Sequence, residues 1–301
     1  MTIAEALNVS DRTISFRDAE VLLAAVLDCD RSHLHTHGEQ VLTPAQEEAY
    51  QSSLTRRENN EPVAHIVGYK EFYGRRFIAD KRALIPRPET EGAVERALAW
   101  AVPYFQSHLK ATGKPCPLRI LELGTGGGPI AISLALELSA QSIPATIIAT
   151  DIAPEALEQA QENWQILGKG SRTDLVVLKC IEADLFDHSS ITTRPFDLII
   201  ANLPYVETTW QVETGAQPDV VFFEPDVALF GGADGLDIYR RFFAEAPTHL
   251  EAGGAVIIEY GDTQTTAITP LATAAFPDKL CTVHQDYAGL DRILELLPAK
   301  K

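Results

Sequence analysis

The sequence RILELGTGGGPIAISLALEL, residues 119–138, joins two apolar runs through a glycine-rich turn. The first run predicts a buried strand over residues 119–123, and the second predicts a helix over residues 130–138. Glycines let the backbone of such a turn approach a ligand closely, and the amides at the following helix N-terminus can bind a polar group. The ligand-binding turn that we expect consists of Gly124, Thr125, Gly126, Gly127 and Gly128.

Apolar runs and amphipathic segments alternate along the rest of the chain. This alternation predicts a doubly wound α/β sheet with mostly parallel strands. Pro154 and Gly168 are suited to begin and end one of the helices between the strands. The expected strands cover residues 119–123, 146–150, 175–179, 196–201 and 255–260, followed by an antiparallel pair around 280–283 and 292–297.

The first part of the chain has a different pattern, with apolar residues at helical spacing between positions 16 and 27. The sequence TPAQ at 43–46 provides an N-cap, a proline at the first helical position and a capping-box glutamine. Aromatic and β-branched residues around Gly74 predict a hairpin that leads into PRP at 86–88. We therefore expect a helical domain over residues 1–70, a hairpin and linker over 71–90, and the α/β domain over 91–301.

The composition limits the classes of function. The 301 residues include 25 Lys plus Arg against 42 Asp plus Glu, which gives a formal charge of −17. Such a surface repels phosphate backbones, so we expect no direct nucleic-acid partner. No run of about 18 apolar residues and no secretory signal occurs, which predicts a cytoplasmic protein without a membrane segment. The cysteines form no C-x-x-C pair, and His33, His35 and His37 lack further ligands at suitable spacing, so we expect no metal site.

The strand expected over residues 146–150 ends at Asp151. A carboxylate at this point can accept hydrogen bonds from two ribose hydroxyls, which indicates a ligand that contains adenosine. Asp151 could instead cap the helix that begins near Pro154. A dinucleotide fingerprint that starts at Gly124 fails at Pro129, but a register shifted by two residues keeps NAD binding open.

The strand expected over residues 196–201 ends in the tetrapeptide Asn202-Leu203-Pro204-Tyr205. Carboxyl ends of strands line the crevice of an open α/β sheet, so this tetrapeptide should face the same cleft as the glycine turn. Amides and aromatic amines are poor nucleophiles because their lone pair is delocalised. The Asn202 side-chain oxygen and the Leu203 carbonyl can each accept one N–H and so orient such a nitrogen for methyl transfer. Pro204 stiffens the turn and Tyr205 offers an aromatic face, although an ordinary strand-ending turn is the alternative.

Several segments together resemble one known family, the release factor glutamine methyltransferases. Two of them, LIPRPETE at 84–91 and FEPDVALFGGADGLDIYRRF at 223–242, are more specific than the glycine turn because the generic fold requires neither. The resemblance also includes EPVAHIVGYKEFYGRRF at 61–77, LELGTGGGPIAISLAL at 121–136, TDIAPEALEQAQEN at 150–163, ANLPYV at 201–206 and IIEYG at 257–261. It covers nearly the whole chain.

The resemblance implies a class I methyltransferase fold, Rossmann-like with a mostly parallel seven-stranded sheet, behind a small helical domain that recognises the substrate. It implies S-adenosylmethionine as cofactor, bound at the positions matching the glycine turn, Asp151 and Asn202 and released as S-adenosylhomocysteine. The substrate would be the glutamine of a Gly-Gly-Gln sequence in a class 1 peptide chain release factor, methylated on its side-chain nitrogen N5 and seated against Asn202, Leu203, Pro204 and Tyr205. Arg87, Glu89 and Glu91 in LIPRPETE either begin a helix or line the cleft between the domains.

Two positions depart from the family pattern. The family usually has Asn-Pro-Pro-Tyr, whereas Leu203 occupies the second position here. Relatives often place Trp at the position of Leu185, so an adenine would pack on an aliphatic side chain in this protein. Asn-Leu-Pro-Tyr is similar to ribosomal RNA adenine dimethyltransferases, which makes N6 of adenine in RNA or DNA the first alternative substrate. The second alternative is a non-catalytic or NAD-binding α/β protein whose helical domain docks a partner.

Overall fold

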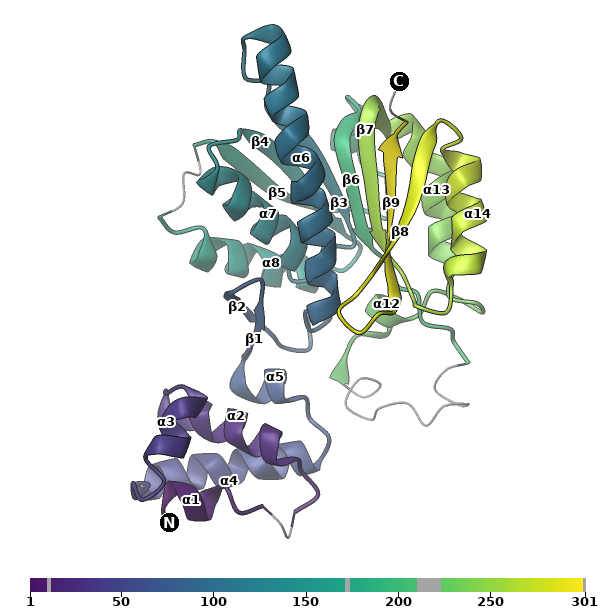
Figure 1. Ribbon diagram of the computed structural model, residues 1–301. Coiled ribbons are helices and arrows are strands. Elements are labelled where there is room, and N and C mark those ends of the chain that lie inside the picture. The colour runs from purple at the N-terminus through teal and green to yellow at the C-terminus, as the bar shows by residue number, and fades with distance from the viewer. Residues whose placement is uncertain (10–11, 171–173, 210–222, 300–301) are drawn as a thin grey trace.

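Short helices pack together at the N-terminus in the computed structural model, which describes residues 1–9, 12–170, 174–209 and 223–299 (Figure 1). Their apolar side chains, among them Leu23 and Tyr50, form a separate buried cluster. Thr43 caps the longest of these helices through a capping box with Gln46, as the sequence predicts. The helices are α1 (Ile3–Ala6), α2 (Phe16–Leu27), α3 (Arg31–Thr36), α4 (Pro44–Glu58) and α5 (Val63–Val67).

A hairpin connects these helices to the larger part of the chain. Strands β1 (Tyr69–Phe72) and β2 (Arg75–Ile78) pair antiparallel. Tyr73 and Gly74 both have positive φ, the conformation of a tight two-residue hairpin turn. Phe72 and Phe77 are fully buried in the core of the α/β part, so the hairpin is fixed to that part.

The α/β part is built on a sheet with the strand order β5-β4-β3-β6-β7-β9-β8. Strands β3 to β7 are parallel, and β9 runs antiparallel to both β7 and β8. This confirms the mostly parallel seven-stranded sheet with a closing antiparallel pair. The strands are β3 (Leu118–Leu123), β4 (Ala145–Asp151), β5 (Val176–Glu182), β6 (Phe196–Asn202), β7 (Leu250–Glu259), β8 (Lys279–Gln285) and β9 (Asp291–Pro298).

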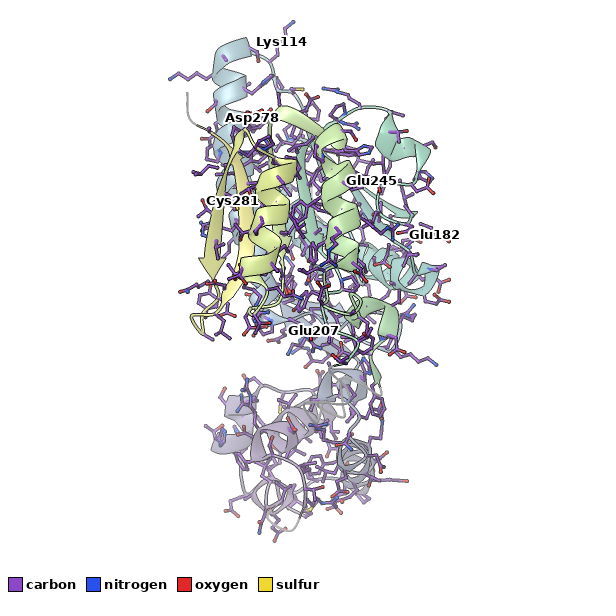
Figure 2. All side chains as sticks on the ribbon, turned by 90° about the vertical axis from the view of Figure 1, so that its right-hand side faces the viewer. Lys114, Glu182, Glu207, Glu245, Asp278 and Cys281 are labelled. Atoms are coloured by element: carbon purple, nitrogen blue, oxygen red, sulfur yellow. The ribbon has the colours of Figure 1, made fainter. Side chains whose placement is uncertain are left out.

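Helices cover both faces of this sheet, and alternate strand residues point into two cores. Ile120 of β3 lies in the core under α6 (Glu91–Thr112), α7 (Pro129–Ala140) and α8 (Pro154–Leu167), which follow the short helix η1 (Pro88–Thr90). Leu121 lies in the opposite core under α13 (Asp237–His249) and α14 (Thr265–Ala275), the face turned to the viewer in Figure 2. Two one-turn helices, α9 (Ser189–Thr192) and α12 (Asp226–Leu229), complete the described elements.

The connection order creates a switch point between β3 and β6. From β3 the chain continues outward through β4 and β5, and it then returns to β6 on the other side of β3. Crevices in such sheets open at the carboxyl ends of the strands that flank the switch point. The N-terminal helices lie beyond this same edge (Figure 1), and Glu207, in the segment after β6, lies on the side of the α/β part nearest to them (Figure 2). Within the described ranges, no helix is long and apolar enough to span a bilayer.

Candidate active site

The glycine turn follows β3 at the switch point. Gly124 and Gly128 both have positive φ, at 72° and 83°, which side chains rarely adopt. A Cβ at Gly128 would lie only 2.8 Å from Cδ1 of Ile132, and one at Gly124 would lie 3.1 Å from Cδ2 of Leu203. The turn is therefore pressed against helix α7 on one side and against the tetrapeptide after β6 on the other.

The buried carboxyl group of Glu122 binds this turn and the first turn of α7. Glu122 accepts hydrogen bonds from the Thr125 hydroxyl at 2.7 Å and from the Ala131 backbone amide at 3.1 Å. Burial raises the pKa of Glu122 to about 8, and the two hydrogen bonds only partly oppose that shift. Glu122 was not predicted as a site residue, although an acidic residue inside the apolar run RILEL is a visible signal in the sequence.

Asp151 lies at the end of β4, next to the glycine turn. Its carboxylate accepts hydrogen bonds from the backbone amides of Gly126 at 2.8 Å and Ala153 at 3.0 Å. Burial raises the pKa of Asp151, and its backbone hydrogen bonds lower it. Among the described residues, Ala153 occupies the N-cap of α8 and no side chain caps that helix, so the alternative of Asp151 as the cap is wrong. Its two oxygens retain lone pairs for further donors.

One pocket joins the glycine turn to the tetrapeptide after β6. Gly124, Thr125, Gly126, Gly127, Asp151, Leu185, Asn202, Leu203 and Pro204 all line it. Of the predicted site residues in the part of the chain that the structure describes, Gly128 and Tyr205 do not. Leu185, on the pocket wall, is buried, and its φ of 52° lies in the left-handed region of backbone conformation.

A second pocket adjoins the first on the far side of the tetrapeptide. Asn202, Leu203 and Pro204 line both pockets, and Tyr205 lines the second. Arg87 also lines both pockets, and Glu89 lines the second, but no described residue of 1–70 lines either pocket. The segment also begins a helix, since η1 covers Pro88–Thr90 and α6 starts at Glu91. The tetrapeptide thus lies between the two pockets, and the glycine turn lines the first of them.

Hydrogen bonds fix the tetrapeptide from several directions. The Asn202 side-chain amide donates to the Thr90 hydroxyl at 3.3 Å. Tyr239 contacts both backbone polar atoms of Leu203, and its hydroxyl also donates to the Glu259 carbonyl. A hydroxyl has one proton, so the Leu203 carbonyl keeps at least one lone pair for another donor. Burial raises the pKa of the Tyr205 phenol, which therefore stays neutral near pH 7.

An ion pair connects the two most family-specific segments at the mouth of this site. Arg87 donates to the buried Glu224 carboxylate at 2.6 Å, and the Ile85 amide donates to its other oxygen at 3.1 Å. Removing one partner of a buried ion pair is costly because the other charge stays buried. LIPRPETE and the segment after β6 are therefore held together beside the second pocket.

The first pocket fits an adenosine-bearing cofactor. The glycine turn leaves its backbone open to a ligand, Asp151 provides acceptors for ribose hydroxyls, and Ile152 and Leu185 provide apolar wall. The dinucleotide alternative depends on the same turn, but the pocket continues directly to Asn202. The residues present therefore suit a cofactor that lies close to the tetrapeptide after β6.

The chain is similar to known proteins in sequence and in structure. Residues 3–68 match the family model described as the PrmC N-terminal domain, and residues 117–295 match a methyltransferase domain. A release factor glutamine methyltransferase of Cereibacter sphaeroides is 38% identical over 284 residues, which cover 94% of this chain and 91% of the relative. One of Lactococcus lactis is 36% identical over 243 residues, with coverage of 80% and 79%. A solved release factor-specific protein-(glutamine-N5) methyltransferase of Alicyclobacillus acidocaldarius is 24% identical, with 72% and 95% coverage and a TM-score of 0.41.

Proposed function

The chain belongs to the release factor glutamine methyltransferase family, and on that premise we propose that it methylates a glutamine side chain in a class 1 release factor. The methyl donor is S-adenosylmethionine, and the site of methylation is the amide nitrogen N5 of a Gly-Gly-Gln glutamine. One observation carries the proposal: Asn202, Leu203 and Pro204 line both the pocket of the glycine turn and the pocket next to it.

The residues of the first pocket would hold the cofactor. The glycine turn and Asp151 would bind its polar groups, and Leu185 would pack against its adenine. When bound, S-adenosylmethionine supplies an electrophilic methyl group and leaves as S-adenosylhomocysteine. Because Asn202 lines the same pocket, an amide held by that residue would be within reach of this group.

The tetrapeptide would orient the glutamine. A primary amide has two N–H groups, and the Asn202 side-chain oxygen and the Leu203 carbonyl can accept one each. Both hydrogen bonds keep the nitrogen in a single orientation, which reduces the entropy that must be lost during reaction. Tyr205, in the second pocket, would pack against the flat amide, and Pro204 would keep the turn stiff.

The charge of the chain supports a protein substrate. A formal charge of −17 disfavours the phosphate backbone of an RNA or DNA substrate. The N-terminal helices lie beyond the carboxyl edge of the sheet, where they could contact a protein that delivers the glutamine (Figure 1). Release factors act on ribosomes, so we place this reaction in the cytoplasm.

Mass spectrometry tests the proposal directly. A Gly-Gly-Gln release factor is incubated with the enzyme and S-adenosylmethionine, and the peptide that contains the glutamine is analysed. We expect one added methyl group on that glutamine and none on a matched release factor with Gly-Gly-Ala. Radiolabel from the methyl donor appearing in RNA or DNA instead would favour the adenine alternative. A thermal shift with NAD but none with S-adenosylhomocysteine would favour the non-methyltransferase alternative.

A further inference from the structure

A buried carboxyl group lies next to Asn202 and is not needed for the chemistry described so far. Glu259 is the last residue of β7, and the parallel register of β6 and β7 pairs it with Asn202 (Figure 1). Only 1% of Glu259 is exposed, and its Oε2 atom has no hydrogen bond of ordinary geometry to any residue that the structure describes. Burying an incompletely paired carboxyl destabilises a protein, so its position calls for an explanation.

A series of polar contacts leads from this carboxyl to Asn202. The Thr90 side chain lies near enough to the Glu259 carboxyl to lower its pKa. The same Thr90 oxygen accepts the hydrogen bond from Nδ2 of Asn202 at 3.3 Å. Thr90 is itself buried and lines the first pocket, and the Tyr205 hydroxyl lies 3.5 Å from Oε1 of Glu259. Glu259 thus contacts, directly or through one hydroxyl, two members of the tetrapeptide.

The direction of these hydrogen bonds determines which end of the Asn202 amide faces the pocket. An ionised carboxylate can only accept, so a Thr90 hydroxyl that contacts Glu259 must direct its single proton to that carboxylate. The Thr90 oxygen can then only accept from its other neighbour, and the NH₂ end of Asn202 is the end that can donate. The Asn202 oxygen is left on the opposite side, free to accept an N–H from a substrate.

We propose that Glu259 is a positioning residue that acts through Thr90 to keep the Asn202 side-chain oxygen turned toward the substrate amide. The inference rests on the proposed function only in the identity of that substrate. An Asn202 turned the other way would present NH₂ to the substrate N–H groups, two donors facing each other, and would not orient the amide.

The protonation of Glu259 gives the arrangement a dependence on pH. Burial raises the pKa of Glu259 to about 7. The contact with Thr90, the charge of Arg292 and the contact with Tyr205 oppose this shift, and the charge of Glu89 adds to it. The nearby Tyr239 phenol stays neutral because burial raises its pKa strongly. A protonated Glu259 can donate to Thr90, which frees the Thr90 proton for the Asn202 oxygen and favours the reversed amide. The productive orientation should therefore be lost as the pH falls through about 7.

Kinetics of three variants test this relay, the series of contacts from Glu259 through Thr90 to Asn202. Thr90→Val removes the hydroxyl at nearly constant volume, Thr90→Ser retains it, and Glu259→Gln removes the titration. At a pH where Glu259 is ionised, we expect kcat of Thr90→Val to be roughly ten-fold below that of wild type, and kcat of Thr90→Ser to be close to that of wild type. KM for S-adenosylmethionine should change little in all three. The wild-type kcat should decline below about pH 7, and this inflection should be absent in Glu259→Gln. An unchanged kcat in Thr90→Val, or an inflection that persists in Glu259→Gln, would overturn the proposal.

An NMR titration tests the same relay without any substrate. In protein labelled with ¹⁵N-asparagine, the Asn202 side-chain resonances are assigned by their absence in Asn202→Ala. We expect them to shift with an inflection near pH 7 in the wild type and not in Glu259→Gln. Resonances that stay constant through this range in the wild type would refute the relay. Because no substrate is used, a failure here is distinct from a failure to methylate a release factor.

Discussion

The hydroxyl oxygen of Tyr239 lies 3.2 Å from the backbone nitrogen of Leu203 and 3.3 Å from the carbonyl oxygen of the same residue. Tyr239 is fully buried in α13, and its hydroxyl also donates to the Glu259 carbonyl at the end of β7. One phenol therefore holds the turn after β6 and the end of the neighbouring strand. The proline usual in the family has no N–H, so Leu203 adds a buried donor, and Tyr239 provides its acceptor.

We expect this contact to appear in a double-mutant cycle. Tyr239→Phe leaves the Leu203 amide and the Glu259 carbonyl without their partner, which should lower the free energy of unfolding by about 1–3 kcal/mol. A Leu203→Pro background lacks the backbone N–H at position 203. In that background Tyr239→Phe should lower the free energy of unfolding by roughly 1 kcal/mol less. Urea denaturation of the four proteins measures the difference. Strictly additive effects would contradict the assigned role of Tyr239.

Asn202→Ala should separate binding of the cofactor from transfer of the methyl group. The variant loses the acceptor proposed to orient the substrate amide, so we expect methyl transfer to fall by about two orders of magnitude or more. Many other residues line the first pocket, so calorimetry should still detect binding of S-adenosylhomocysteine. Glu207→Ala, a change at an exposed position that lines neither pocket, serves as the control. A fully active Asn202→Ala enzyme would remove the proposed mechanism.

Leu185→Trp tests where the adenine binds. Leu185 is 7% exposed and lines the first pocket, and an indole there offers a larger flat surface to a base. We expect the affinity for S-adenosylhomocysteine to rise by roughly three- to ten-fold, the equivalent of one aromatic stacking contact. Leu280→Trp, at a position 61% exposed on the edge strand β8, should leave the affinity unchanged. Equal affinities of Leu185→Trp and wild type would place the adenine elsewhere.

Glu122 should make the stability of the protein depend on pH. Its pKa is raised by burial from 4.5 to about 8, so between these values the folded state holds a proton that the unfolded chain releases. The contribution to stability is therefore complete below about pH 4.5 and is lost as the pH rises through about 8. Thermal unfolding of Glu122→Gln should show a smaller loss of Tm between about pH 6 and about pH 9 than wild type. Burial also raises the pKa of Glu259, so this residue contributes a loss of stability of the same sign. The loss of Tm in Glu122→Gln should therefore be smaller than in wild type but not zero. A variant with the full wild-type loss would contradict the assignment.

The sequence predicted the fold and the crevice because both depend on local patterns. Apolar runs identify buried strands, and the ends of β3 and β6 meet at the switch point by the connection rules of doubly wound sheets. The start of β7 was predicted at residue 255, whereas the strand begins at Leu250. Glu251 and the glycines at 253 and 254 interrupt the apolar pattern there, although the backbone of Leu250 pairs with Phe196.

The supporting residues of the site could not be predicted in this way. Thr90, Tyr239 and Glu259 meet the tetrapeptide from three separate elements, and nothing in their local sequences indicates that contact. A partial signal did exist, since Glu122 and Glu259 are acidic residues inside apolar strands. Which group each carboxyl faces depends on strand order and register, and those require the folded structure.

The near contact between Gly124 and Leu203 has a consequence for how this protein can evolve. A methyl group added at position 124 would lie 3.1 Å from the Leu203 side chain and 3.4 Å from the Asn202 carbonyl. Any enlargement at 124 therefore pushes on the residues proposed to bind the substrate, and any enlargement at 203 pushes on the turn proposed to bind the cofactor. The two positions are constrained as a pair, so lineages that alter one should carry a compensating change at the other.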